Sequence, residues 1–415
     1  MVIVYNYNIQ LIIMQFAYIL FKRRQDKVNN VAVMEIGTSK IGVYVGSNGI
    51  NNSISVAGSF EQPYAGFYNG EFVEPEKLSE DLCNALAKAE INAGERIAKL
   101  FVGVPADFST CITKSFTQSF GEKLRIEEQD ILEIYQQANQ LKDNSNYVLI
   151  SCSPVFFVLD DGRKVLNPIG EKTSRISGEI SYIYAEKSFI ANINVCLRQF
   201  GISTVEYLSA TLATNTYLLP LKKREEPSVI IDIGYISTSV SIIKGNGLKL
   251  LSTFSAGGGQ VVSDLSECLQ ISYQEAEQLK KQIILSVVPK LGDGYEIQRH
   301  GQVIPIPMQD ANEIVCDRLD MICSLVNRCL EQIPKNDLYK MPFYLTGGGI
   351  CFIKGAKDYF SKVFGVNVEI LSPPHLQFSK PNYSVELGLL NSAINQEKKR
   401  KTNRFFNFLK KFTKR

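Results

Sequence analysis

The chain has 415 residues, of which 45% are apolar and 21% charged, and its formal net charge is only +3. Such a composition is typical of a folded protein, and the length suggests two or more domains. Nine cysteines form no CxxC pair and only two histidines occur. These counts argue for free thiols in a reducing compartment and against a disulfide framework, a zinc site or a histidine-rich metal site.

The positive charge is unevenly distributed along the chain. Residues 398–415 hold nine Lys or Arg and no acid, so the rest of the chain is net acidic. A nucleic-acid binder is expected to carry a basic face on its folded body, and no upstream stretch has that pattern. We therefore expect no nucleic-acid partner.

Residues 1–30 are read as an N-terminal extension. The apolar run 9–21 (IQLIIMQFAYILF) is shorter than the about 20 residues that a bilayer helix needs, and its basic residues follow it, unlike those of a secretory signal. Two interpretations stay open: an over-long gene model, with translation starting at Met14 or near residue 27, or a real segment. A second, N-terminal membrane anchor is the less favoured interpretation.

A carboxylate stands at the tip of a predicted buried hairpin in residues 31–45 (VAVMEIGTSKIGVYV), where Glu35 precedes a short polar turn. Taken alone, this is an ordinary hairpin with a polar turn. Residues 229–245 (VIIDIGYISTSVSIIKG) repeat the pattern with Asp232 in the equivalent place. The repeat indicates two related halves.

Two such hairpins facing each other would form a phosphate site. Backbone N–H groups of glycine and hydroxyl turns bind phosphate oxygens, and Mg²⁺ is usually reached by one or two carboxylates together with the phosphates. A third element, residues 343–355 (FYLTGGGICFIKG), is a strand, a glycine turn and the start of a helix. It is either a tight strand-to-helix turn or a flat surface for a nucleotide base.

In this order, the three elements resemble the phosphate-1, phosphate-2 and adenosine motifs of the actin, Hsp70 and hexokinase superfamily, and within it most resemble FtsA. EIGTSK is similar to phosphate-1, DIGYIST to phosphate-2 and LTGGG to the adenosine motif. Residues 165–184 (VLNPIGEKTSRISGEISYIY) resemble the subdomain that FtsA inserts in its first domain, and residues 69–90 resemble its early helix. The resemblance runs from about residue 30 to the C-terminus.

The resemblance implies an α/β chain with an actin-like two-domain ATPase fold and an FtsA-type inserted subdomain in the first domain. The predicted division is 31–104 and 187–226 for the first domain, 105–186 for the inserted subdomain, 227–256 and 343–395 for the second domain, 257–342 for its smaller insertion, and 396–415 for a flexible basic linker and amphipathic helix. Helices are predicted at 75–93, 125–141, 187–200, 272–285 and 309–333.

The resemblance also implies a site for ATP and Mg²⁺. The phosphates would be bound by Gly37, Thr38, Ser39 and Lys40 from one half and by Gly234, Ser237 and Thr238 from the other. Magnesium would be held through water by Glu35 and Asp232. The base would lie on Gly347, Gly348 and Gly349, and Glu277 and Lys280 would contact ribose and adenine; a solvated ion pair is the alternative for these last two.

Three departures from the family pattern concern hydrolysis. Glu35 stands where the family has Asp, and Tyr235 and Ile236 replace the glycines that usually follow Gly234. Residues 208–214 (LSATLAT) lack the Glu or Gln with which hydrolysing relatives orient the attacking water. Phosphoryl transfer needs such positioning, so we expect ATP binding with weak or absent hydrolysis, and we assign no catalytic residue.

The C-terminal segment 402–415 (TNRFFNFLKKFTKR) predicts an amphipathic helix. Phe405, Phe408, Leu409 and Phe412 follow a helical period, and Lys410 and Lys411 are among the basic residues around them. This pattern is typical of a helix at the surface of an anionic membrane. A solvated tail and a helix that docks on a partner protein are the alternatives.

The favoured function is that of an ATP-binding cell-division protein that polymerises into filaments at the membrane and tethers the FtsZ ring, together with other division proteins. Its expected location is peripheral, on the cytoplasmic face at the division site. The alternatives are a PilM-like pilus assembly protein, which ordinarily lacks the terminal helix, a divergent FtsA paralogue without turnover, and a sugar or acid kinase of the same superfamily.

Overall fold

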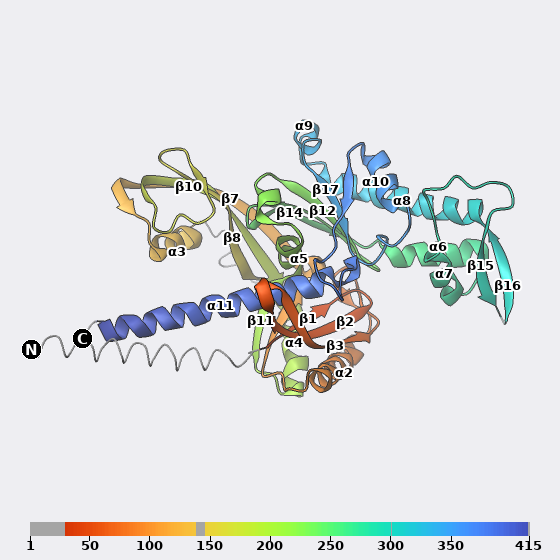
Figure 1. Ribbon diagram of the computed structural model, residues 1–415, viewed down its shortest axis with the longest axis horizontal. Helices are drawn as coiled ribbons and strands as arrows, with labels where there is room; N and C mark the ends of the chain where they lie inside the picture. Colours follow the sequence, from red (N-terminus) through yellow and green to blue (C-terminus); the bar gives the residue numbers. More distant parts are fainter. Residues whose placement is uncertain (1–29, 138–145, 300, 414–415) are drawn as a thin grey trace, which may run out of the picture.

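Two five-stranded sheets form the centre of the molecule (Figure 1). The structure is a computed structural model that describes residues 30–137, 146–299 and 301–413. The first sheet has the order β11-β6-β1-β2-β3 and the second the order β14-β13-β12-β17-β18. The first contains β1 (Val31–Ile36), β2 (Lys40–Asn48), β3 (Ile54–Pro63), β6 (Lys99–Val104) and β11 (Thr204–Ser209). The second contains β12 (Ser228–Ile233), β13 (Thr238–Lys244), β14 (Gly247–Phe254), β17 (Phe343–Thr346) and β18 (Val368–Ile370).

The two sheets have the same topology. In each, three consecutive strands pair antiparallel, and the first of them pairs parallel with a later strand, β6 or β17. A further parallel strand, β11 or β18, completes the sheet. The duplication predicted from the two hairpin sequences is therefore confirmed at the level of whole sheets.

Helices α2 (Pro75–Ala93) and α4 (Lys187–Phe200) cover the first sheet and have the predicted bounds. Helix α2 begins at a proline, which fits the first helical turn, and ends at Gly94 with φ +68°, a left-handed conformation that favours glycine. Leu78, Leu82 and Leu86 lie on its buried face. Burial of this apolar stripe holds the helix on the sheet.

The segment after Ala106–Phe108, within the range 105–186 predicted as an inserted subdomain, forms a sheet of its own. Its sheet has the order β7-β10-β8-β9, and helix α3 lies within the predicted range 125–141. The elements are β7 (Ser109–Arg125), α3 (Glu128–Gln137), β8 (Tyr147–Leu159), β9 (Lys164–Val165) and β10 (Lys172–Glu186). A short hairpin, β4 (Phe67–Tyr68) and β5 (Glu71–Phe72), lies in the first domain.

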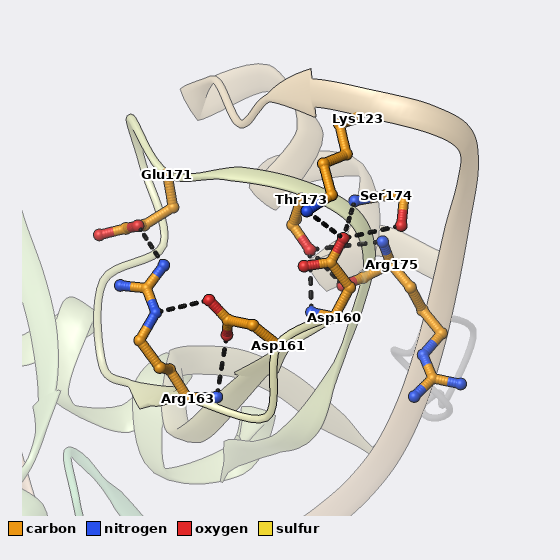
Figure 2. Close-up of polar contacts among 8 residues, drawn as sticks. All are labelled: Lys123, Asp160, Asp161, Arg163, Glu171, Thr173, Ser174 and Arg175. Carbon is orange, nitrogen blue, oxygen red and sulfur yellow. Dashed lines mark hydrogen bonds and ion pairs between the residues drawn. The ribbon is translucent and has the colours of Figure 1, made fainter.

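Polar contacts fix the turns at the tip of this subdomain (Figure 2). The backbone N–H and hydroxyl of Ser174 donate to Asp160 Oδ2 at 2.9 and 2.8 Å, and these bonds lower the Asp160 pKa to about 2. Arg163 donates from Nε to Asp161 Oδ2 at 2.7 Å. Ser174 belongs to the stretch 165–184 that resembles the FtsA insertion, and its bonds to Asp160 hold the end of β8 to β10.

The second domain carries its own helical insertion. Helix α7 (Tyr273–Lys280) is shorter than the predicted helix 272–285, whereas α8 (Met308–Leu330) nearly fills the predicted range 309–333. The remaining elements are α6 (Gly258–Leu269), β15 (Gly294–Arg299), β16 (Gln302–Pro307), α9 (Lys335–Leu338) and α10 (Ala356–Phe364). One continuous apolar core joins these helices to the second sheet.

Helix α11 (Ser384–Thr413) differs from the predicted division of the chain. Its first turns pack on the first sheet and on α5 (Ala210–Leu218), with Leu387 and Leu390 in one core with Val33, so the residues up to 395 do not all belong to the second domain. A stripe of leucines cannot tell from sequence alone which sheet it will cover.

The same helix runs without a break through 396–401, the segment predicted as a flexible linker, and its C-terminal part extends away from both sheets (Figure 1). Side chains beyond residue 400 lie outside the described residues, and so does the packing of the predicted membrane stripe. The expectations for residues 1–29 also lie outside them.

Candidate functional site

The two predicted hairpins have equivalent turns. In the first, the Gly37 N–H donates to the Lys40 carbonyl at 2.9 Å, and in the second the Gly234 N–H donates to the Ser237 carbonyl at 2.9 Å. Glu35 and Asp232 each stand one residue before the end of the first strand, at the same place in the strand pairing. The strand register therefore brings both carboxylates to the turns.

The two turns meet across a cleft between the domains. Thr38 Oγ1 accepts a hydrogen bond of 3.0 Å from the Ile236 N–H. Beside this contact, the Ser237 hydroxyl donates to Asp107 Oδ2 at 3.3 Å. Each of these two contacts includes one residue that the sequence assigns to phosphate, Thr38 or Ser237.

A cavity of about 330 Å³ lies between the turns. Ten of the predicted site residues line it: Glu35, Gly37, Thr38, Ser39, Lys40, Asp232, Gly234, Ser237, Gly347 and Gly348. A second cavity of about 510 Å³ is lined by Glu277, Lys280, Gly348 and Gly349, with Phe352 and Tyr383. Gly348 and Asn382 line both, so the two cavities adjoin and form one elongated site.

Glycines let three backbone turns meet at this junction. Gly347 has φ +91°, and a Cβ there would clash with Asp232 Oδ1 and lie 2.5 Å from the Ile233 carbonyl oxygen. A Cβ on Gly349 would lie 2.7 Å from the same oxygen. The glycines of the LTGGG turn are thus required for its close packing on β12, and they also leave their part of the surface of the second cavity free of side chains.

Thr238 does not take the predicted position. Its side chain is fully buried, and its hydroxyl donates to the Ala256 carbonyl at 2.6 Å. Thr238 is the first residue of β13, directly opposite Ile233, and strand pairing turns its side chain away from the cavity. The assignment of Thr238 to phosphate is therefore corrected.

Lys40 lies in the cavity but is already paired. Its ammonium donates to Glu61 Oε1 at 2.7 Å and to Glu386 Oε1 at 2.8 Å. Glu61 comes from β3 and Glu386 from the first turn of α11. A phosphate would have to share or displace these carboxylates to reach Lys40.

The carboxylates of the cavity have displaced pKa values. Burial, followed by repulsion from Glu386, raises the pKa of Glu35 well above its ordinary value and that of Asp232 to about 6. Burial also raises the pKa of Glu386. The charged forms of these groups therefore need a nearby cation.

Tyr235 lies between the two cavities. Its hydroxyl donates to Glu277 Oε1 at 2.9 Å, and its ring approaches Gly259, where a Cβ would lie 3.0 Å from a ring carbon. Lys280 is only 9% exposed, and its ammonium donates to the Gly258 carbonyl at 2.8 Å. Burial lowers the Lys280 pKa to about 8. Lys280 is thus a buried group of the site and not half of a solvated ion pair.

Sequence reasoning missed three acidic residues of the cavity: Glu61, Asp107 and Glu386. Asp107 follows the end of β6, where a parallel strand directs side chains into a crevice, and this rule could have found it. Glu386 is the single acid in the apolar stretch SVELGLL, which was a second signal. Glu61 carries no such signal, because it stands on an alternating edge strand.

Part of the segment 208–214 reaches the cavity. Ala210 and Thr211, at the start of α5, line its wall. Neither carries a carboxylate or an amide that could orient a water molecule. The segment that lacks the Glu or Gln of hydrolysing relatives therefore lines the cavity itself.

Comparison with known proteins agrees with this fold. A family described as "Cell division protein FtsA" matches residues 229–388. The cell division protein FtsA of Bacillus subtilis is 24% identical over 365 residues, which cover 87% of this chain and 82% of that protein. Among solved structures, the PilM–PilN type IV pilus biogenesis complex has a TM-score of 0.59 at 17% identity, covering 88% of this chain and 98% of that one. MreB5 of Spiroplasma citri bound to AMPPNP has a TM-score of 0.55 at 14% identity, covering 90% and 98%.

The duplicated sheets and the cleft between their hairpins define an actin-like protein, and these structural likenesses support that fold. More particularly, the chain is similar in sequence to the cell division protein FtsA over most of its length. The family resemblance predicted from the three motifs is thus confirmed.

Proposed function

We propose that the elongated site binds ATP with Mg²⁺. The observation that carries this proposal is the junction of the two cavities, one between two glycine and hydroxyl turns and one beside a glycine surface with Lys280. Phosphates fit the first and the base the second, with Glu35 and Asp232 as the carboxylates that would reach Mg²⁺ through water. The relation to MreB5, which was solved with AMPPNP, supports the same cofactor class.

ATP would be bound without rapid hydrolysis. The cavity wall at Ala210 and Thr211 offers no carboxylate or amide to orient water, and such a group supplies orders of magnitude in rate. The chain would then act as a switch whose state depends on nucleotide occupancy.

Titration of the full-length protein with Mg-ATP tests this proposal. Binding should be detectable in the wild type and weakened about tenfold or more by Asp232→Asn, which removes one carboxylate from the cavity. Asp317→Asn is the matched control, because Asp317 is exposed on α8. The absence of binding by the wild type, or turnover on the order of 1 per second or faster, contradicts the proposal.

We further propose that the protein forms filaments and tethers the FtsZ ring and other division proteins to the cytoplasmic face of the membrane at the division site. The sequence relation to cell-division proteins and the actin-like fold support this role. No helix within the described part of the chain is long and apolar enough to cross a bilayer. The tail of α11, with Phe405, Phe408, Leu409 and Phe412 beside Lys410 and Lys411, would attach the protein peripherally.

Liposome co-sedimentation tests the attachment. Removal of residues 402–415, or the double replacement Phe408→Asp and Phe412→Asp, should abolish binding to anionic liposomes and leave thermal melting unchanged. The matched control replaces Ile50 and Leu291, two exposed apolar residues outside the tail, with Asp. Undiminished binding by the truncated protein would exclude the tail as the anchor.

A further inference from the structure

Glu386 is a buried carboxylate that the proposed nucleotide site does not explain. It stands in the first turn of α11 and is 1% exposed. Its Oε1 accepts from Lys40, whereas its Oε2 is buried and has no hydrogen-bond partner. A buried charged oxygen without a partner is costly, so a ligand is expected at this position.

Glu35 presents a second oxygen of the same kind. It is 9% exposed, and its Oε2 is also buried without a hydrogen-bond partner. A Cβ on Gly42 would lie 3.4 Å from Glu386 Cγ and 3.6 Å from Glu35 Oε2. The two carboxylates therefore flank the same glycine, and both line the phosphate cavity.

The cavity carries an excess of negative charge. Its only cationic lining residue is Lys40, whose ammonium bonds to Glu61 and Glu386. Its carboxylates are Glu35, Glu61, Asp107, Asp232 and Glu386. One lysine thus faces five carboxylates in this cavity, and the Oε2 atoms of Glu35 and Glu386 accept no hydrogen bond.

We propose that Glu35 and Glu386 together bind a divalent cation, such as Mg²⁺ or Mn²⁺, in the nucleotide-free protein. Hard cations prefer oxygen ligands, and Mg²⁺ commonly takes one or two carboxylates and keeps several waters. The cavity of about 330 Å³ has room for those waters. Among the described residues, no group of three or more His, Cys, Asp or Glu side chains is arranged to hold a metal ion.

This cation would do two things. It would neutralise the carboxylates beside Lys40 and, on the basis of the proposed function, prepare the cavity for phosphates. It would also bridge β1 and the first turn of α11, because its two ligands come from these elements. The helix that carries the C-terminal tail would then be fixed directly to the first hairpin.

Mn²⁺ binding to the full-length protein, freed of nucleotide and metal, tests the proposal. Electron paramagnetic resonance of free Mn²⁺ should show binding by the wild type, and Glu386→Gln and Glu35→Gln should each weaken it about tenfold or more. Glu80→Gln is the matched control, because Glu80 is an exposed glutamate of α2 that lines neither cavity. It should change Mn²⁺ affinity less than about threefold.

Thermal melting gives a second readout that does not depend on nucleotide. Mn²⁺ should raise the melting temperature of the wild type and leave that of Glu386→Gln unchanged, because only the wild type keeps both carboxylates of the proposed site. Absence of Mn²⁺ binding at millimolar concentration, or equal affinity in Glu386→Gln, overturns the proposal. Mn²⁺ binding without ATP binding would instead contradict only the proposed function.

Discussion

The two hairpins share a backbone and differ in their surroundings. Both place a carboxylate one residue before the turn, and both close the turn with the same glycine N–H bond. Glu35 in the first hairpin lies beside two charged side chains, Lys40 and Glu386. Asp232 in the second also feels the charge of Glu386, but it lies against the backbone of the glycine turn at Gly347. The two hairpins thus have the same backbone fold, but charged side chains surround the first carboxylate and backbone atoms surround the second.

This difference separates two ways of building a ligand site. The second hairpin is shaped by backbone contacts, so any added side-chain atom meets main chain that cannot move. The first hairpin is shaped by charge, so removal of one group leaves another unpaired. Substitutions in the two hairpins should therefore fail for different physical reasons.

Gly347→Ala should have the largest effect. Its positive φ and the close Ile233 carbonyl oxygen leave no room for a Cβ, and we expect a loss of stability of about 3 kcal/mol. Gly103→Ala is the contrast, because its Cβ would meet only the flexible Leu389 side chain, and a loss of about 1 kcal/mol is expected. Urea denaturation followed by circular dichroism measures both losses of stability. Equal losses for the two variants would contradict the claim that backbone contacts shape the second hairpin.

Lys40→Met should come next. It leaves Glu386 buried without its ion-pair partner, and we expect a loss of about 2 kcal/mol, less than for a fully buried pair because Lys40 is partly exposed. Addition of Glu386→Gln to this variant should restore part of the stability, since it removes the unpaired charge. If the double variant is no more stable than Lys40→Met, then the balance of charges does not determine the stability of the first hairpin.

Ser237→Ala should have the smallest effect. Ser237 occupies the place in the second turn that Lys40 has in the first, and its hydroxyl makes one bond, to Asp107 at 3.3 Å. Loss of one such bond should cost about 1 kcal/mol or less. A loss as large as that for Lys40→Met, measured in the same urea series, would show that the two turns are not built differently.

The sequence predicted the parts of this molecule that follow from repetition and periodicity. The echo of Glu35 at Asp232 predicted two related sheets, and helices 75–93 and 187–200 have their predicted bounds. Glu386 and the course of α11 could not be predicted in this way, because a leucine stripe does not specify which sheet it covers. Thr238 was misplaced because a turn residue and the first residue of a strand look alike until the register is known.

Protection of Lys280 from acylation tests the central claim, that the cleft between the hairpins binds ATP, most directly. Because burial lowers the Lys280 pKa to about 8, its amine becomes neutral as the pH rises through about 8 and not near the ordinary 10.5, so it should react selectively near pH 8. Mass spectrometry of the acylated protein reports each lysine separately, with the solvent-exposed Lys335 as the internal control. The account predicts that Mg-ATP suppresses labelling of Lys280 and leaves Lys335 unchanged. Equal labelling of Lys280 with and without saturating Mg-ATP would contradict it.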